Sequence, residues 1–234
     1  MHRMALRSLV HDRGRLAAAL TGVAFATVLL LVQFGLYEGF REASSELVRR
    51  VGGDVWVIAR GTSHLDDTEA LAAGAAIGAR THPCVRAARA VVVGFAPVRR
   101  PTGGLRSLQL IGLDLSMPEG LAPWRFEIGL PHDLRGPDRV SVDRSDLDRL
   151  GVLGDAVGTR LEIAGRVVRV AALTRDIRSV SFNPLAFADI RTARELLGLG
   201  DDQASYWVLS VRTPACLADV IQRAERDPEL RAVD

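Results

Sequence analysis

The chain has no lysine, and all 30 of its basic residues are arginine. A P-loop places a lysine amine on the nucleotide phosphates, and Schiff-base catalysis uses a lysine amine as its nucleophile. The sequence as it stands can carry out neither kind of chemistry. Any ATP hydrolysis that this chain serves must therefore take place on another polypeptide, and we expect ATP to be bound there.

Catalytic and metal-binding motifs are also missing. The sequence contains neither G-x-S-x-G nor H-E-x-x-H, and its five histidines are scattered without a pair at ligand spacing. His82 and Cys84 are near neighbours, but two ligands do not fill a tetrahedral metal site. Asp143, Asp146 and Asp148 lack the central glycine and closing glutamate of a calcium loop, so we interpret them as caps and surface groups of a short helix. We therefore expect no enzyme activity and no catalytic, cofactor-binding or metal-binding residues.

Cysteine and net charge are both scarce. The two cysteines are Cys84 and Cys216, and no C-x-x-C motif occurs. An oxidising compartment would allow a disulfide between them, but their spacing alone leaves open whether their Cα atoms come within bridging distance. A formal charge of +2 argues against the basic stripe typical of nucleic-acid-binding proteins. We expect no nucleic-acid partner.

The sequence does contain one long apolar run. Residues 16–37 include no charged side chain, and their clearly polar members are Thr21, Thr27 and Gln33. About 20 helical residues at 1.5 Å each span the roughly 30 Å hydrocarbon core of a bilayer. A buried helix of a soluble domain would normally keep a polar face, and a signal peptide would have a shorter apolar region followed by a small-x-small cleavage site. We therefore predict an uncleaved transmembrane helix that crosses a lipid bilayer once.

The flanks of this run extend the helix and orient it. Residues 1–15 have the amphipathic pattern of a short helix at the cytoplasmic membrane surface. Residues 38–52 keep the helical spacing of apolar side chains, which predicts a stalk helix that ends at a double glycine. The basic residues closest to the run are Arg13 and Arg15 before it and Arg41 after it, and this bias favours a cytoplasmic N-terminus. Everything after the single span would then be exported.

Small residues recur every four positions within the membrane segment. They are Ala18, Gly22 and Ala26 in its first half, and Gly35 and Gly39 at its outer end. Small side chains let helix backbones approach closely in lipid, so these five residues are our candidates for packing against other membrane helices. The same spacing also arises by chance in an alanine-rich segment, and the sequence does not decide between the two.

Residues 53–234 mix strand and helix patterns, which is typical of an α+β domain. We expect two lobes, a mixed α/β lobe and a small β lobe at about residues 138–175 inserted into it. The predicted strands are residues 55–58, 85–100, 105–113, 140–142, 158–163, 167–173 and 206–212, and the predicted helices are residues 66–79, 145–150, 190–197 and 214–226. Residues 117–137 and 179–184 are predicted loops, because they are rich in proline, glycine or serine.

Several short segments follow one another in a recognisable order. Those around the membrane helix are ALRSL (5–9), RGRL (13–16) and QFGLYEGF (33–40). Those in the exported domain are GDVWV (53–57), LIGLD (110–114), VSVD (140–143), LGV (150–152) and GDAVG (154–158). In this order, over nearly the whole chain, they resemble the start of ABC-exporter permeases of the MacB and DevC type, an FtsX-like family.

The resemblance implies a role in transport across the bacterial inner membrane. Permeases of this family pair with a separate cytoplasmic ABC ATPase, act as homodimers and dock on a periplasmic adaptor protein. Their membrane helices pass ATP-driven motion to a periplasmic core domain, which helps drive export through the adaptor and an outer channel. The resemblance therefore predicts a permease subunit whose domain after the stalk is periplasmic.

Permeases of this family have four membrane helices, three of which follow the periplasmic domain. The chain thus corresponds to the N-terminal part of such a permease, and the sequence leaves open whether it is a fragment or one half of a split permease. The alternative is a single-pass, membrane-anchored extracytoplasmic binding or sensor domain. That alternative predicts a pocket in the exported domain.

Overall fold

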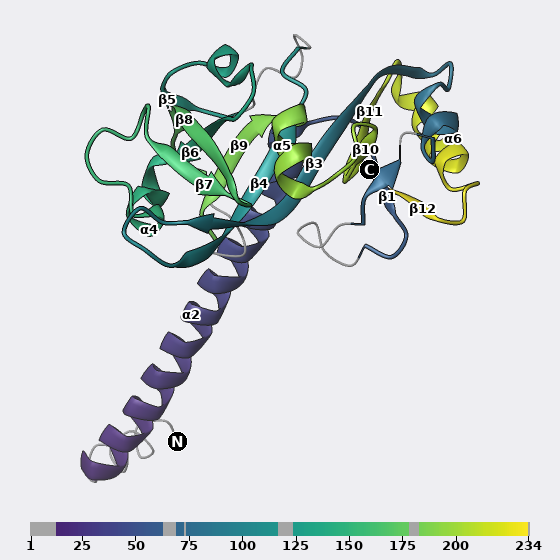
Figure 1. Ribbon diagram of the computed structural model, residues 1–234. Coiled ribbons are helices and arrows are strands. Elements are labelled where there is room, and N and C mark those ends of the chain that lie inside the picture. The colour runs from purple at the N-terminus through teal and green to yellow at the C-terminus, as the bar shows by residue number, and fades with distance from the viewer. Residues whose placement is uncertain (1–12, 63–68, 73, 117–123, 178–182, 234) are drawn as a thin grey trace. The chain divides into compact units, whose positions relative to one another are not determined.

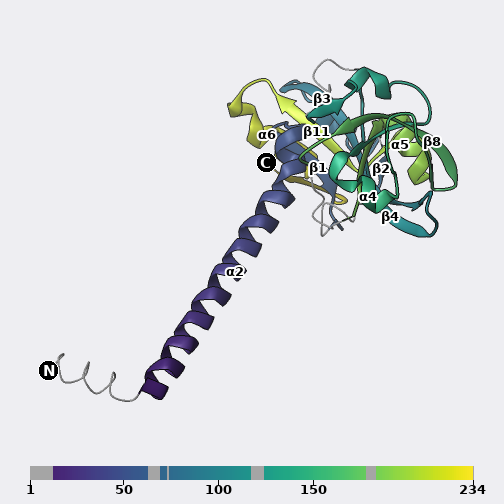
Figure 2. The same cartoon turned by 90° about the vertical axis from the view of Figure 1, so that its left-hand side faces the viewer.

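The computed structural model describes residues 13–62, 69–72, 74–116, 124–177 and 183–233, with side chains described throughout these ranges except at 40–47, 49 and 50. The chain divides into two compact units, Met1–Glu46 and Leu47–Asp234. The first contains most of a long helix, and the second is a domain built on a mixed sheet (Figures 1 and 2). The predicted α+β class with one N-terminal apolar helix is confirmed.

The long helix, α2, runs from Arg13 to Val51 and comprises 39 residues. Its apolar part, Arg13–Gly39, is 27 residues long, and an 18-residue window within it has a mean hydropathy of 2.1, with none of that window buried within the protein. A helix of this length extends about 40 Å, which exceeds the roughly 30 Å of a hydrocarbon core. Thr27 Oγ1 donates to the carbonyl of Val23 at 2.8 Å, so this hydroxyl is satisfied within the helix, as lipid requires. By length and composition, α2 can cross a membrane.

The helix ends at the double glycine, as the sequence predicts. The N–H of Gly52 donates to the carbonyl of Val48 at 2.9 Å, which caps the last turn. Gly52 and Gly53 both have positive φ angles, 68° and 97°, which residues with a β-carbon rarely adopt. A β-carbon on Gly53 would also collide with Cγ1 of Val208 on a neighbouring strand. Only glycine therefore allows the chain to turn this tightly into the sheet.

Two βαβ halves, far apart in the sequence, form one end of the domain. The first is β1 (Val55–Ala59), α3 (Ile77–Arg80) and β3 (Val85–Arg99), and the second is β11 (Tyr206–Val211), α6 (Leu217–Ala224) and β12 (Leu230–Val233). Their strands lie in the order β12-β1-β11-β3, and each strand is antiparallel to its neighbours. This is the split βαβ topology of a ferredoxin-like unit. In Figure 1, α6 lies beside β12 at the end of the domain.

The chain between β3 and β11 builds the rest of the sheet. After β3 the strand order continues β4-β9-β6-β8-β5, and β7 pairs with both β3 and β8. The strands are β4 (Leu105–Leu113), β5 (Phe126–Ile128), β6 (Arg139–Asp143), β7 (Arg160–Ile163), β8 (Arg166–Thr174) and β9 (Leu185–Asp189), and the helices are α4 (Leu147–Leu150) and α5 (Ile190–Leu197). The small lobe predicted at about 138–175 contributes β6, β7 and β8, and it shares its hydrogen-bonded sheet with the larger lobe through β9 and β3.

Apolar side chains cover both faces of the sheet. On one face, helices α3, α5 and α6 bury residues such as Ala79, Ala193 and Val220 against the strands. On the other face, Val51 from the last turn of α2 joins a second cluster. The aromatic members of that cluster pack in pairs, Trp56 edge-on to Tyr206 at 5.5 Å and Trp124 stacked on Phe187 at 4.1 Å between ring centroids.

The hairpin of β3 and β4, the hairpin of β7 and β8, and helices α4, α5 and α6 lie where the sequence predicts them. The predicted helix at residues 66–79 is wrong over the part that the structure describes. Residues Leu71–Ala72 form β2, which pairs with β10 (Gln203–Ala204), and only Ile77–Arg80 is helical. The predicted loop at 117–137 contains β5 and a 3₁₀ turn at Pro131–Leu134. The remaining predictions for residues 63–68, 117–123 and 178–182, and the predicted amphipathic segment over residues 1–12, lie outside the described residues.

Candidate functional site

The five small residues of the membrane helix lie on exposed positions of α2. Ala18, Gly22, Ala26, Gly35 and Gly39 are all exposed, and a β-carbon built on any of the three glycines meets no atom within 4 Å. At 100° per residue, the first three positions form one stripe, and the Gly35–Gly39 pair lies about 120° around the helix from it. The geometry thus offers two open strips for close helix contact. The packing role of these residues stays a prediction.

A disulfide joins Cys84 and Cys216, which settles the pairing that the sequence left open. Their Cα atoms are 5.7 Å apart, and 132 residues separate them in the chain. Cys84 lies just before β3 and Cys216 just before α6, so the bridge ties the two halves of the ferredoxin-like unit together. The backbone reinforces this corner, because the N–H of Arg212 donates to the carbonyl of Cys84 at 2.9 Å.

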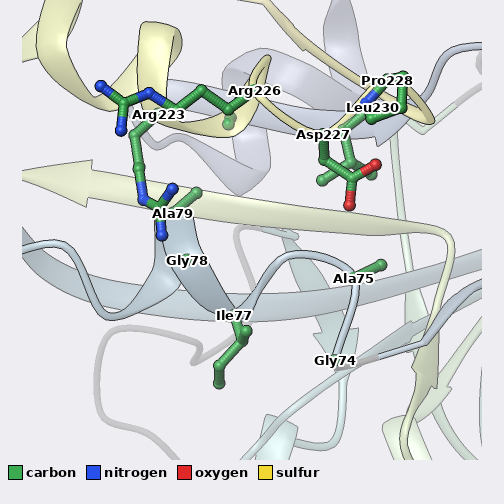
Figure 3. A pocket seen from close by; sticks show the side chains of 11 residues that line it. Gly74, Ala75, Ile77, Gly78, Ala79, Arg223, Arg226, Asp227, Pro228 and Leu230 are labelled. Carbon is green, nitrogen blue, oxygen red and sulfur yellow. The ribbon is translucent and has the colours of Figure 1, made fainter.

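A cavity of about 450 Å³ lies between α3 and the turn that follows α6. Figure 3 shows its walls, with Gly74 to Ala79 on one side and Arg223 to Leu230 on the other. Ala79, Ala224 and Leu230 are almost fully buried and form an apolar floor. No sequence pattern indicates this cavity, because its two walls are more than a hundred residues apart.

The turn on one side of the cavity is fixed by Arg60. Its backbone N–H donates to the carbonyl of Glu229 at 2.7 Å. Its side chain donates from Nε to the carbonyl of Pro228 at 2.7 Å and from Nη2 to the carbonyl of Leu230 at 2.9 Å. One arginine thus holds three consecutive carbonyls. Because Arg60 directly follows β1, the position of this wall of the cavity depends on β1 as well as on the turn itself.

From the same wall as this turn, Arg223 extends across the cavity, and its guanidinium lies over Gly78. A β-carbon at position 78 would come within 2.8 Å of Nη2 of Arg223, so the bare glycine leaves the space that this side chain occupies. Figure 3 shows Arg223 extending down to Gly78 and Ala79, whereas the side chain of Arg226 points away from them. Charge therefore enters the cavity from Arg223 on α6 and from Asp227 on the turn, and Arg226 also lines it.

Asp143 and Asp146, two of the aspartates that could suggest a calcium site, have structural roles. Asp143 accepts hydrogen bonds from the N–H of Ser145 at 3.0 Å and the N–H of Ile177 at 3.2 Å. Asp146 accepts from the N–H of Leu185 at 3.0 Å and from Arg149 at 3.1 Å. Within the described ranges, no three His, Cys, Asp or Glu side chains gather as a metal would need.

Burial raises the pKa of Asp146 above its ordinary value. The nearby charge of Asp143 raises this pKa further, whereas the hydrogen bond from Leu185 and the charge of Arg149 lower it. A buried carboxylate that is held by a strand N–H fixes the start of β9 against the turn before α4. We conclude that this pair of aspartates organises the fold around the small lobe.

Comparisons with known proteins agree with this architecture. A family model described as the MacB-like periplasmic core domain matches residues 16–227. The fold is similar to the extracellular domain of the noncanonical ABC-type transporter YknZ from Gram-positive bacteria, with a TM-score of 0.57, 10% identity, and coverage of 77% of this chain and 99% of that one. It is also similar to the periplasmic region of MacB from Actinobacillus actinomycetemcomitans, with a TM-score of 0.57, 11% identity, and coverage of 80% and 91%. No match was found among curated proteins.

Proposed function

The chain belongs to the MacB-like periplasmic core domain family, and on that premise we propose that it is the N-terminal part of a permease subunit of an ABC-type exporter. One observation carries this proposal: the family match begins inside the apolar part of α2 and continues through the last helix of the domain. A membrane anchor and an extracytoplasmic domain of this family are thus present in one chain. That combination is what a permease of this kind needs.

In this proposal the chain has a mechanical role and is not an enzyme. It binds no cofactor of its own, and ATP binds to a separate cytoplasmic ABC ATPase, because a chain without lysine lacks the residue that a P-loop places on the phosphates. Hydrolysis on that subunit drives motion of the periplasmic domain. A periplasmic adaptor protein then couples this motion to export.

The end of α2 is built to pass on such motion. Val48 and Val51 pack against the second apolar cluster of the domain. Nη2 of Arg89, on β3, donates to the carbonyl of Val51 at 3.1 Å. The last helical turn is therefore held by the sheet itself. A displacement of this turn would act directly on β3, the strand that is shared by both parts of the domain.

We propose that the N-terminus is cytoplasmic and that the domain lies in the periplasm, with α2 in the bacterial inner membrane. Arg13 and Arg15, at the start of α2, support this orientation, and the Cys84–Cys216 disulfide supports it independently. Disulfides persist in oxidising compartments such as the periplasm and are rare in the cytosol. Alkylation of intact cells under acid quench tests the orientation. We expect both thiols to be blocked by the disulfide, and recovery of the fully reduced chain would reverse the proposed topology.

We also propose a homodimer that forms through the small residues of α2. Cross-linking in membranes would test it with Gly22→Ile, which fills the open space over this glycine, and with Leu20→Phe as a matched control about 160° around the helix. We expect Gly22→Ile to reduce the cross-linked dimer severalfold and Leu20→Phe to leave it unchanged. Equal effects of the two variants would remove Gly22 from the interface.

The proposed function itself is tested by affinity isolation of the tagged chain from its own membranes in mild detergent. We expect an ABC ATPase with a P-loop lysine and a periplasmic adaptor protein to be retained together. A control chain in which an unrelated membrane helix replaces residues 13–39 should lose the ATPase. Isolation of the chain without either partner, in a detergent that preserves other exporters, would refute the permease assignment.

The cavity between α3 and α6 favours a second candidate function, a membrane-anchored extracytoplasmic binding or sensor domain. That function predicts a pocket in the exported domain, and the cavity is one. It does not account for the family match over the membrane helix. The two candidates are distinguished by the affinity isolation, because a binding domain alone needs no ATPase.

A further inference from the structure

Three charged residues, Arg223, Arg226 and Asp227, line the cavity beside α6, and the opposite charges of Arg223 and Asp227 do not neutralise each other. Arg223 and Asp227 both line it, four residues apart in the chain. Among the described residues, no ion pair joins Arg223 to Asp227, and neither side chain is in an ion pair with any other group. The helix ends at Ala224, so the geometry that would bring positions i and i+4 together no longer applies at Asp227.

Only one oxygen of Asp227 is engaged by the fold. Its Oδ1 accepts from the N–H of Glu229 at 3.0 Å, which leaves Oδ2 available toward the cavity. Figure 3 shows this carboxylate pointing toward Ala75, at the other end of the cavity from the guanidinium of Arg223. The cavity thus has an acceptor at one end, a donor at the other, and the apolar floor between them.

The walls that carry these charges are held firmly. Arg60, which directly follows β1, binds the carbonyls of Pro228, Glu229 and Leu230. It therefore immobilises the turn that carries Asp227. The Cys84–Cys216 disulfide fixes the start of α6, which carries Arg223. A preformed site with separated charges loses little on binding, because its groups need not be ordered again.

We propose that this cavity binds a small zwitterion with an aliphatic body, of the amino-acid or short-peptide class. The ligand carboxylate pairs with Arg223, its ammonium group pairs with Asp227, and its side chain rests on Ala79, Ala224 and Leu230. Charge-assisted hydrogen bonds of this kind are roughly twice as strong as neutral ones. A volume of about 450 Å³ lies within the range of about 300–1,000 Å³ that is usual for small-molecule sites.

Calorimetric titration of the full chain in detergent tests this site with L-leucine and with the dipeptide Leu-Leu. Isovalerate, which lacks the ammonium group, isoamylamine, which lacks the carboxylate, and N-acetyl-leucinamide, which lacks both charges, serve as matched probes. We expect at least one zwitterion to bind, and each probe that lacks a charge to bind about tenfold more weakly or worse. The tighter of leucine and Leu-Leu decides between a free amino acid and a peptide.

Three variants locate the binding. Arg223→Gln and Asp227→Asn remove one charge each and keep hydrogen-bonding groups, and Arg231→Gln removes a nearby exposed charge that does not line the cavity. We expect the first two to weaken binding at least about tenfold and the third to leave it unchanged. Thermal unfolding of each variant shows whether it is folded. If a variant does not fold, the affinities of the wild-type chain for the probes that lack a charge test the proposal instead.

Two results would overturn the proposal. One is the absence of saturable binding of either zwitterion up to roughly 10 mM, which is weaker than any useful site. The other is equal affinity for leucine and N-acetyl-leucinamide, or an equal loss in Arg231→Gln and Arg223→Gln. Either result leaves the permease function intact, because ligand binding and isolation of the ATPase are separate measurements.

Discussion

Removal of the Cys84–Cys216 disulfide should lower the free energy of unfolding by a large and calculable amount. The bridge closes a loop with a sequence separation of 132 residues, which includes the whole segment between the two βαβ halves. In the chain-entropy model, a loop of this length restricts the unfolded ensemble by about 5 kcal/mol at 25 °C. Typical domains are stable by about 5–15 kcal/mol, so the bridge supplies a major share of the total.

The double variant Cys84→Ser/Cys216→Ser, as the full chain in detergent, tests this number by urea unfolding. Tryptophan fluorescence follows the transition, because Trp56, Trp124 and Trp207 are buried in the apolar clusters of the domain. With a denaturant slope of about 2.5 kcal/mol per molar urea, the unfolding midpoint should fall by roughly 2 M. The folded structure should persist, because α6 stays packed through Val220 and Ala224.

A reductant separates the bridge from the side effects of substitution. Reduction of the wild-type chain should shift the midpoint as far as the double substitution does, and the double variant should not respond to reductant. A loss below about 1 kcal/mol would refute the reasoning, because it would mean that the unfolded chain is not freed by opening the loop. A loss that appears in the variant and not on reduction would assign the effect to the serine side chains themselves.

Three further predictions concern single positions. Gly53→Ala should cost about 2–3 kcal/mol in urea unfolding, because the positive φ and the collision with the neighbouring strand both act against a β-carbon. The raised pKa of Asp146 means that the folded state keeps this proton to a higher pH than the unfolded chain does. The stability that Asp146 contributes is therefore present below its pKa in the unfolded chain, and it is lost as pH rises through its pKa in the folded state. Asp146→Asn should remove this fall between acid and neutral pH, whereas Asp148→Asn, on the exposed side of the same turn, should not. Arg80→Gln should cost about 1 kcal/mol and shift the emission of Trp207, because the guanidinium lies 3.5 Å above that ring.

Elements with strong local signals could be predicted from the sequence. Helix α5 lies where expected because Asp189 accepts from the N–H of Arg191 at its start and Gly198 ends it with a φ of 68°. The hairpin of β7 and β8 was found for a similar reason, since Ala164 and Gly165 both have the positive φ that a tight turn needs. In each case the residues that end the element are the ones that identify it.

Elements that depend on distant partners could not be predicted. Strand β9 is buried at all five positions and lies parallel to β4, so it shows no alternation, and its pairing depends on a strand more than seventy residues away. The prediction of a helix at 66–79 was wrong because Leu71 and Ala72 pair with β10. This long-range pairing overrides the helix propensity of an alanine-rich segment. The disulfide and the cavity likewise join segments whose proximity only the topology creates.

The topology explains how one strand can serve both parts of the domain. Strand β3 begins next to the disulfide, pairs with β11 within the ferredoxin-like unit, and then continues as the partner of β4 and β7. Near its start it also carries Arg89, which binds the last carbonyl of α2. Because a strand in a sheet is far stiffer along its length than a loop, a force applied at this end reaches the other part of the domain without crossing a flexible linker. The single sheet is therefore the feature of this fold that best fits a domain whose task is to relay motion.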